Sequence, residues 1–241
     1  MLIIKTGSTI PALKAPFGDF EDWFTDRLGT EFSYETREVF RGDPLPSPEA
    51  FDGIVVTGSP AMVSHRQEWS EETARWLARS ARMYRPVLGV CYGHQLIAHG
   101  LGGEVGPNPK GRQIGTHYVD FDAQGDPLLG SLGRRRRLQT THVESVLRLP
   151  PGAVPLARTD MDPNHAFRIG SHVWAVQFHP EFDDEVMAGY LHQRRAELTA
   201  EGIDVQALLE KLTPAPAGRE VLEGFARIVR QHALTNRRKA G

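Results

Sequence analysis

The sequence lacks the features that would tie it to a membrane, an oxidising compartment or a nucleic acid. Only one of its 241 residues is cysteine, so no internal disulfide can form and a reducing compartment is expected. No apolar run approaches the roughly 20 residues that span a bilayer, and the run that begins at Met1 is too short for a secretory signal. The net charge of −2 gives no reason to expect a nucleic-acid or membrane partner. The sequence therefore predicts a cytoplasmic protein.

Patterns that bind nucleotides or metals are also missing. There is no glycine-rich phosphate loop of the Walker type, and no group of His, Cys, Asp and Glu has the spacing of metal ligands. No metal and no cofactor are therefore expected. The main local excess of charge is the run from Arg134 to Arg137, interpreted as a solvated turn, with a phosphate-binding patch as the alternative.

The arrangement of apolar residues predicts an α/β protein. Short apolar runs alternate with amphipathic segments, which is typical of a mostly parallel central sheet flanked by helices. Asp19 is a predicted helix cap for the segment that carries Phe20, Trp23, Phe24 and Leu28 on one face. The predicted strands of this part cover residues 1–5, 33–40, 53–56 and 87–90, and two further predicted helices cover 70–84 and 93–101.

The second half of the chain changes character twice. Residues 104–177 are rich in β-branched residues, glycine and proline, which predicts a mixed or antiparallel extension of the sheet. Its predicted strands cover residues 118–121, 137–141, 154–159, 165–169 and 173–177. From Asp183 onward the pattern is helical. We expect one domain over residues 1–241, with a C-terminal helical extension over 183–241 whose apolar residues pack on the sheet.

The lone cysteine lies in a pattern that favours a nucleophile. A buried strand leads into Cys91 and a helix leaves directly after it, with Gly89 and Gly93 two residues away on either side. This is a Gly-x-nucleophile-x-Gly elbow, a sharp turn that lifts the side chain above the carboxyl end of the sheet. The helix N-terminus favours the thiolate, and the backbone N–H of Tyr92 is free to bind an oxyanion. A buried structural cysteine is the alternative.

A cysteine nucleophile needs a base, and the base needs a partner that orients its ring. His179 follows a buried strand, and Glu181 comes two residues later, so both side chains can face one pocket around Pro180. His142 and Glu144 form a second pair with the same spacing, but apolar residues follow it instead of a strand end. We therefore assign His179 as the base and Glu181 as its orienter.

The motifs resemble those of a known family. Gly89-Val90-Cys91-Tyr92-Gly93-His94-Gln95 resembles the nucleophile motif of class I, triad-type glutamine amidotransferases, as in the amidotransferase domain of GMP synthetase. The run from Gln177 to Glu181 matches the Gln-Phe-His-Pro-Glu run of that family. The resemblance covers residues 3–182 and implies a flavodoxin-like class I amidotransferase fold with a Cys91-His179-Glu181 triad.

The resemblance also implies the rest of the pocket. Gly58, in the loop after a predicted strand, would join Tyr92 in the oxyanion hole, where the family usually has Gly-Gly-Pro and this chain has Gly-Ser-Pro. The substrate would be contacted by Ser59, Gln95, Thr141, His142 and Val143. Ser59 and Val143 stand where the family usually has glycine.

Three functions remain open at this point. The first is hydrolysis of the side-chain amide of glutamine through a γ-glutamyl thioester, with ammonia passed to a separate synthetase, because too few residues follow Glu181 to form one. The second is a stand-alone γ-glutamyl hydrolase or peptidase, resembling the plant enzymes that trim glutathione conjugates. The third is a non-enzymatic binding protein of the same fold. The small-molecule partner is glutamine in the first case and another γ-glutamyl compound in the second.

Overall fold

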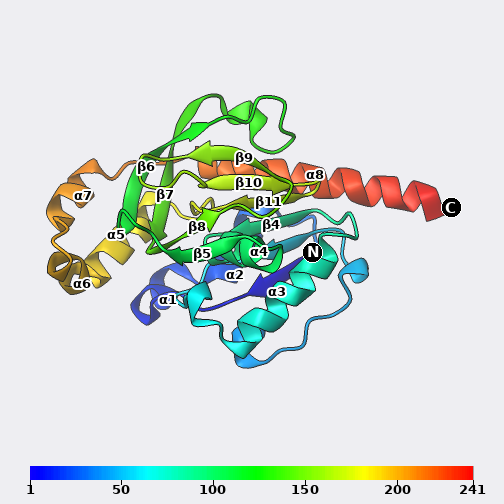
Figure 1. Ribbon diagram of the computed structural model, residues 1–241, viewed down its shortest axis with the longest axis horizontal. Coiled ribbons are helices and arrows are strands. Elements are labelled where there is room, and N and C mark those ends of the chain that lie inside the picture. Colours follow the sequence, from blue (N-terminus) through cyan, green and yellow to red (C-terminus); the bar gives the residue numbers. More distant parts are fainter. Residues whose placement is uncertain (241) are drawn as a thin grey trace.

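The computed structural model describes residues 1–240, with side chains described up to residue 236. Its centre is a nine-stranded sheet in the order β2-β1-β3-β4-β11-β10-β9-β6-β7 (Figure 1). The first five strands of this order are parallel to one another. They are β2 (Glu35–Glu38), β1 (Leu2–Lys5), β3 (Ile54–Val56), β4 (Val87–Val90) and β11 (Val173–Val176).

The other end of the sheet is antiparallel, which confirms the predicted mixed extension. It comprises β10 (Ala166–Ile169), β9 (Ala153–Arg158), β6 (Gln113–Phe121) and β7 (Arg135–His142). A separate two-stranded sheet pairs β5 (Glu104–Pro107) with β8 (Glu144–Arg148). These two strands were not predicted, because each is short and its stability depends on a partner some forty residues away in sequence.

Helices cover both faces of the parallel half, so the molecule has three layers (Figure 1). Alternate residues of β1 point to opposite faces, as strand geometry requires. Ile3 packs in one cluster with residues of α2 (Phe20–Leu28) and α8 (Ala217–Ala240). Leu2 and Ile4 pack in the other with residues of α3 (Glu68–Ser80) and α4 (Tyr92–Gly100).

A third apolar cluster lies beside the carboxyl end of the sheet. It joins Trp23 of α2 and Phe182 to apolar residues of four other helices. These helices are α1 (Pro11–Phe17), α5 (Asp184–Gln193), α6 (Arg195–Ala200) and α7 (Val205–Lys211). Short 3-10 turns lie at Val39–Arg41, Pro48–Ala50, Val63–His65 and Gly130–Leu132.

The C-terminal helices pack on the sheet, as expected. Val221, Leu222 and Phe225 of α8 are fully buried in the same cluster as Ile3. Leu208 and Leu209 of α7 pack less deeply against the third cluster. None of the helices in residues 1–240 combines the length and the apolar character that a membrane crossing requires.

Local signals in the sequence located some boundaries and missed others. Asp19 caps α2 as predicted: its Oδ1 accepts from Phe20 N, and its own N–H donates to Asp22 Oδ2 at 2.9 Å. The helix expected over residues 70–84 spans 68–80 instead. Helix α1 was not predicted, because Pro11 and Pro16 are typical helix breakers, although proline is tolerated in a first turn.

The interpretation of Arg134 to Arg137 as a solvated turn holds for Arg134, which lies in an exposed bend, and is wrong for the other three arginines. Arg135 to Arg137 belong to β7 and pair with β6 in antiparallel register, from Asp120 opposite Arg135 to Tyr118 opposite Arg137. Arg136 points to the other face and forms an ion pair with Glu220 of α8. Partners on β6 and α8 therefore allow a run of like charges in a strand. The sequence of β7 alone does not reveal those partners.

Candidate active site

Cys91 occupies a strained turn between β4 and α4. Its backbone has φ +52° and ψ −102°, one of only three positive φ values among the non-glycine residues that the structure describes. Its N–H donates to Val176 O of β11 at 2.9 Å, and its carbonyl accepts from Gln95 N of α4. Such a conformation costs about 1–3 kcal/mol, so the surrounding strand and helix must impose it. The sharp turn predicted between the strand and the helix at Cys91 is present.

The two glycines beside Cys91 are required by close packing. A Cβ at Gly89 would lie 2.6 Å from the carbonyl oxygen of Gly93, and a Cβ at Gly93 would lie 2.5 Å from that of Val56. Backbone atoms cannot yield as a flexible side chain can. The elbow therefore fits only the Gly-x-Cys-x-Gly pattern that the sequence contains.

His179 and Glu181 lie just beyond the carboxyl end of β11, which neighbours β4. His179 Nδ1 donates to Glu181 Oε1 at 2.7 Å, and both side chains are almost fully buried. Phe182 stacks on the imidazole with ring centroids 4.1 Å apart. A Cβ at Gly218 of α8 would lie 2.7 Å from Pro180 O, so α8 packs directly against the peptide between the two residues. The imidazole is held from several sides.

The charge on His179 follows from its neighbours. Burial alone would lower the pKa of His179, but the Glu181 carboxylate and Cys91 raise it to about 10. Nε2 of His179 has no hydrogen-bond partner among the described residues. Because Nδ1 is bound to Glu181, Nε2 is the atom left for a substrate or for the thiol. The Cys91 thiol itself donates weakly to Thr141 O at 3.6 Å.

Two backbone N–H groups near Cys91 lack an acceptor among the described residues. Gly93 N–H donates to Thr57 O, whereas the N–H groups of Tyr92 and Gly58 have no acceptor in the part of the chain that is described. Gly58 follows β3, whose carboxyl end adjoins that of β4. A Cβ at Gly58 would lie 3.7 Å from Cys91 Cβ and 2.9 Å from His179 Cε1. The loop thus reaches both side chains only because residue 58 is glycine.

Ser59, where the family usually has glycine, is accommodated by another glycine. Its Oγ donates to Thr6 O at 2.8 Å and accepts from Ala61 N at 3.1 Å. A Cβ at Gly7 would lie only 2.6 Å from this Oγ. The Ser59 hydroxyl is therefore engaged in holding its own loop to the loop after β1.

Gln95 and His142 line the pocket, and the Gln95 amide nitrogen and both ring nitrogens of His142 have partners within the protein. Gln95 Nε2 donates to Glu144 O at 2.8 Å and to Gln177 Oε1 at 3.0 Å. His142 lies between Glu144 O, 2.8 Å from Nδ1, and Gln113 Oε1, 3.1 Å from Nε2. Burial, with His165 nearby, lowers the pKa of His142 to about 3, so its ring is neutral. These contacts make both residues supports of the pocket wall.

The same contacts decide against His142 and Glu144 as a base and its orienter. The imidazole meets the backbone carbonyl of Glu144, while the carboxylate accepts from Ser64 N at 3.3 Å. Thr141 and Val143 lie in the same wall, with Thr141 O facing Cys91. Val143 O accepts from Asn108 N, which fixes the loop that carries it.

The pocket has further lining residues that sequence reasoning missed. It encloses about 110 Å³, which suits a ligand of amino-acid size. Ser8 comes from the loop after β1, and Tyr190, Arg194 and Glu197 come from the C-terminal helices. Arg112 also lines it and pairs with Glu197 and Glu201. No local motif marks these residues, because long-range packing brings them to the pocket.

A buried cluster behind the pocket contains side chains that could bind a metal. Ligand atoms of His142, Asp162 and His165 lie within 4.8 Å of one another. His165 Nδ1 donates to Asp162 Oδ2 at 3.2 Å; burial would raise the pKa of Asp162, but this contact lowers it to about 2. Sequence spacing does not reveal this cluster, because long-range packing brings its three side chains together. That the reaction needs no metal stays a prediction.

Comparison with known proteins agrees with this geometry. A family model described as "Glutamine amidotransferase class-I" matches residues 31–195. The chain belongs to the class I glutamine amidotransferases. The resemblance of the Cys91 and His179 motifs to this family is thereby confirmed.

Two relatives align with this chain over most of their own length. It is 28% identical over 185 residues to gamma-glutamyl peptidase 3 of Arabidopsis thaliana, covering 73% of this chain and 74% of that one. It is 32% identical over 174 residues to one subunit of the glutamine-hydrolyzing GMP synthase of Ignicoccus hospitalis, covering 72% and 87%. The match to the GMP synthase of Aeropyrum pernix is 38% identical but spans 25% of that longer protein and 58% of this chain.

Solved structures share the amidotransferase fold. A glutamine amidotransferase from Thermotoga maritima superposes with a TM-score of 0.73 at 22% identity, over 95% of this chain and 96% of the other. The α/β fold predicted for this chain is confirmed.

Proposed function

We propose that this chain hydrolyses the side-chain amide of glutamine through a γ-glutamyl thioester on Cys91, and that the released ammonia serves a separate synthetase chain. The observation that carries this proposal is the 2.7 Å bond from His179 Nδ1 to Glu181 Oε1, which leaves Nε2 beside a cysteine in a nucleophile elbow. A nucleophile, a base and an orienting carboxylate are the components that acyl transfer needs.

In the first half-reaction, the Cys91 proton goes to His179 Nε2, and the sulfur attacks the amide carbon. The raised pKa of His179 keeps that proton on the imidazole at neutral pH. When the C–N bond breaks, the nitrogen takes the proton from His179 and leaves as ammonia. In the second half-reaction, His179 deprotonates a water that attacks the thioester, and glutamate leaves as the thiol reforms.

The oxyanion of each tetrahedral intermediate would be met by the N–H groups of Gly58 and Tyr92. Both are free of other acceptors among the described residues and lie near Cys91. Such fixed donors can contribute about 3–4 kcal/mol to the stability of a transition state. The wall from Thr141 to Val143, supported by Gln95 and His142, would hold the amino-acid end of the substrate through backbone groups.

A synthetase partner is favoured by the relative from Ignicoccus hospitalis, which is named as one subunit of a GMP synthase, since this chain covers 87% of it. The single cysteine also fits the cytoplasm, where thiols stay reduced.

A second candidate is hydrolysis of γ-glutamyl peptides without any partner. The relative of similar length from Arabidopsis, named a gamma-glutamyl peptidase, favours it. The same chemistry applies, with an amine in place of ammonia as the leaving group.

The test is an assay of the purified chain with glutamine and with a panel of γ-glutamyl peptides, beside the variant C91A. Ammonia release from glutamine that C91A abolishes supports the proposal, especially where a synthetase stimulates it. Faster turnover of γ-glutamyl peptides without a partner supports the second candidate. No turnover, together with no labelling of Cys91 by a glutamine-like chloroketone, would indicate a binding protein and contradict both.

A further inference from the structure

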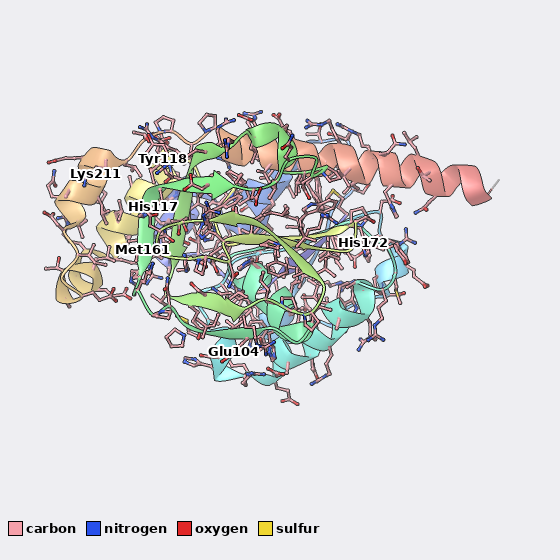
Figure 2. The ribbon with its side chains drawn as sticks, turned by 45° about the horizontal axis from the view of Figure 1, so that its top comes forward. Glu104, His117, Tyr118, Met161, His172 and Lys211 are labelled. Carbon is pink, nitrogen blue, oxygen red and sulfur yellow. The ribbon has the colours of Figure 1, made fainter. Side chains whose placement is uncertain are left out.

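A second groove lies outside the catalytic pocket, on the outer face of the β6–β7 hairpin. It encloses about 650 Å³, and none of its lining residues lines the catalytic pocket. Its floor is the hairpin, and its rims are the loop between β9 and β10 and the end of α7. Figure 2 shows His117, Tyr118 and Met161 near one another at this end of the molecule, with Lys211 beside them.

Two arginines of β7 are fixed over one aromatic ring in this groove. Arg135 and Arg137 alternate along the strand and so share a face. Their guanidinium carbons lie 4.8 Å and 5.0 Å from the ring centroid of Tyr118, and Arg137 Nη2 donates to the Tyr118 hydroxyl at 2.7 Å. Tyr118 is 48% exposed, so the ring and both cations face solvent. Stacking and hydrogen bonding thus order two side chains that would otherwise be mobile.

The groove has an excess of positive charge. Arg135 forms an ion pair with Asp120, with 3.5 Å between Nε and Oδ1. Neither Arg137 nor Lys211 has a carboxylate partner among the described residues. The other acid in the lining is Asp160, which is exposed. Burial lowers the pKa of His117, whose ring therefore adds no charge at neutral pH.

We propose that this groove binds a small molecule that carries a phosphate or polyphosphate group. Guanidinium groups bind phosphate with paired hydrogen bonds, and a lysine adds a point charge. Arg135, Arg137 and Lys211 supply that set of donors. The volume exceeds what one phosphate fills, and Met161 offers an apolar surface to the remainder of an organic phosphate. The proposal does not depend on the reaction at Cys91.

The test is calorimetric titration of the full-length protein with phosphate, pyrophosphate and a nucleoside triphosphate. We expect saturable one-to-one binding that is strongest for the polyphosphates and weakens with added salt. The variants R137K and R135A/R137A should bind more weakly, the second by at least about tenfold, because charge-assisted hydrogen bonds are lost. R219A is the matched control, since Arg219 is an exposed arginine of α8 paired with Glu223, and it should bind as the parent does.

Three results would overturn the proposal. One is the absence of saturable polyphosphate binding at millimolar concentration, and another is equal weakening in R219A. The third is tighter binding of an acidic peptide than of any phosphate, which would make the groove a contact for another protein. Thermal unfolding of each variant checks that the fold is intact.

Discussion

The edge of the His179 imidazole touches the backbone of Gly58: a Cβ at residue 58 would lie 2.9 Å from His179 Cε1. The loops at the carboxyl ends of β3 and β11 therefore pack so closely that a methyl group does not fit between them. This contact gives the first expectation. In G58A, the added methyl must displace the ring or the loop, and kcat should fall by about 10² or more.

The control for G58A is S59G, at the neighbouring position. Ser59 turns its hydroxyl toward Thr6, so removing the side chain should leave kcat within a few-fold of the parent. The free energy of unfolding should fall by about 1 kcal/mol, because a hydrogen bond is lost. Steady-state kinetics and urea unfolding of both variants distinguish the two positions, and equal kinetic losses would contradict this assignment.

The Glu181 carboxylate supports the charged form of His179, and this gives a second expectation. In E181Q, the buried side chain keeps its shape but loses its charge. The pKa of His179 should fall, so the alkaline limb of the kcat profile should move to lower pH, and kcat should drop by about 10²–10⁴. D183N makes the same charge change two residues away and keeps a helix-capping side chain. Its pH profile should match that of the parent.

The strained backbone at Cys91 gives a third expectation, on stability. C91A and C91G should both lose hydrolysis, but only glycine adopts φ +52° and ψ −102° without strain. Relief of strain should exceed the entropy that glycine adds to the unfolded chain, so C91G should be more stable than C91A by about 1 kcal/mol. Chemical denaturation measures this difference. A less stable C91G would mean that the elbow stores no strain.

Two buried histidines give a fourth expectation, on acid stability. Burial lowers the pKa of His94 to about 4 and that of His142 to about 3, whereas an unfolded histidine has a pKa near 6.5. The unfolded chain thus binds more protons below pH 6.5, and stability falls as pH drops from about 6.5 toward these values. Each histidine contributes a slope of up to about 1.4 kcal/mol per pH unit. Urea unfolding between pH 7 and pH 4.5 measures the slope, which H94Q should reduce.

The sequence predicted the elements of the site that depend on a few adjacent residues. The turn at Cys91 could be recognised because steric exclusion at Gly89 and Gly93 is local. The His179–Glu181 pair could be recognised because alternate residues of an extended segment share a side. The parallel strands followed from apolar runs, and the helices from their periodicity.

The rest depended on contacts between distant segments. Strand β5 needs β8 as its partner, and the charges of Arg135 to Arg137 are tolerated in β7 because Asp120, Tyr118 and Glu220 face them. The assignment of Gln95 and His142 as substrate contacts rested on their place in a motif. Only the structure reveals that groups of the protein contact the Gln95 amide nitrogen and the His142 ring, and a substrate contact by either residue stays a prediction.

The packing of Gly218 against Pro180 has a consequence for biosynthesis. Helix α8 is the last described element to leave the ribosome, and it presses on the peptide that joins the base to its orienting carboxylate. Until that helix docks, its packing contact with Pro180 is missing. The hydrolysis proposed for Cys91 would therefore begin only after α8 has left the ribosome and packed on the sheet.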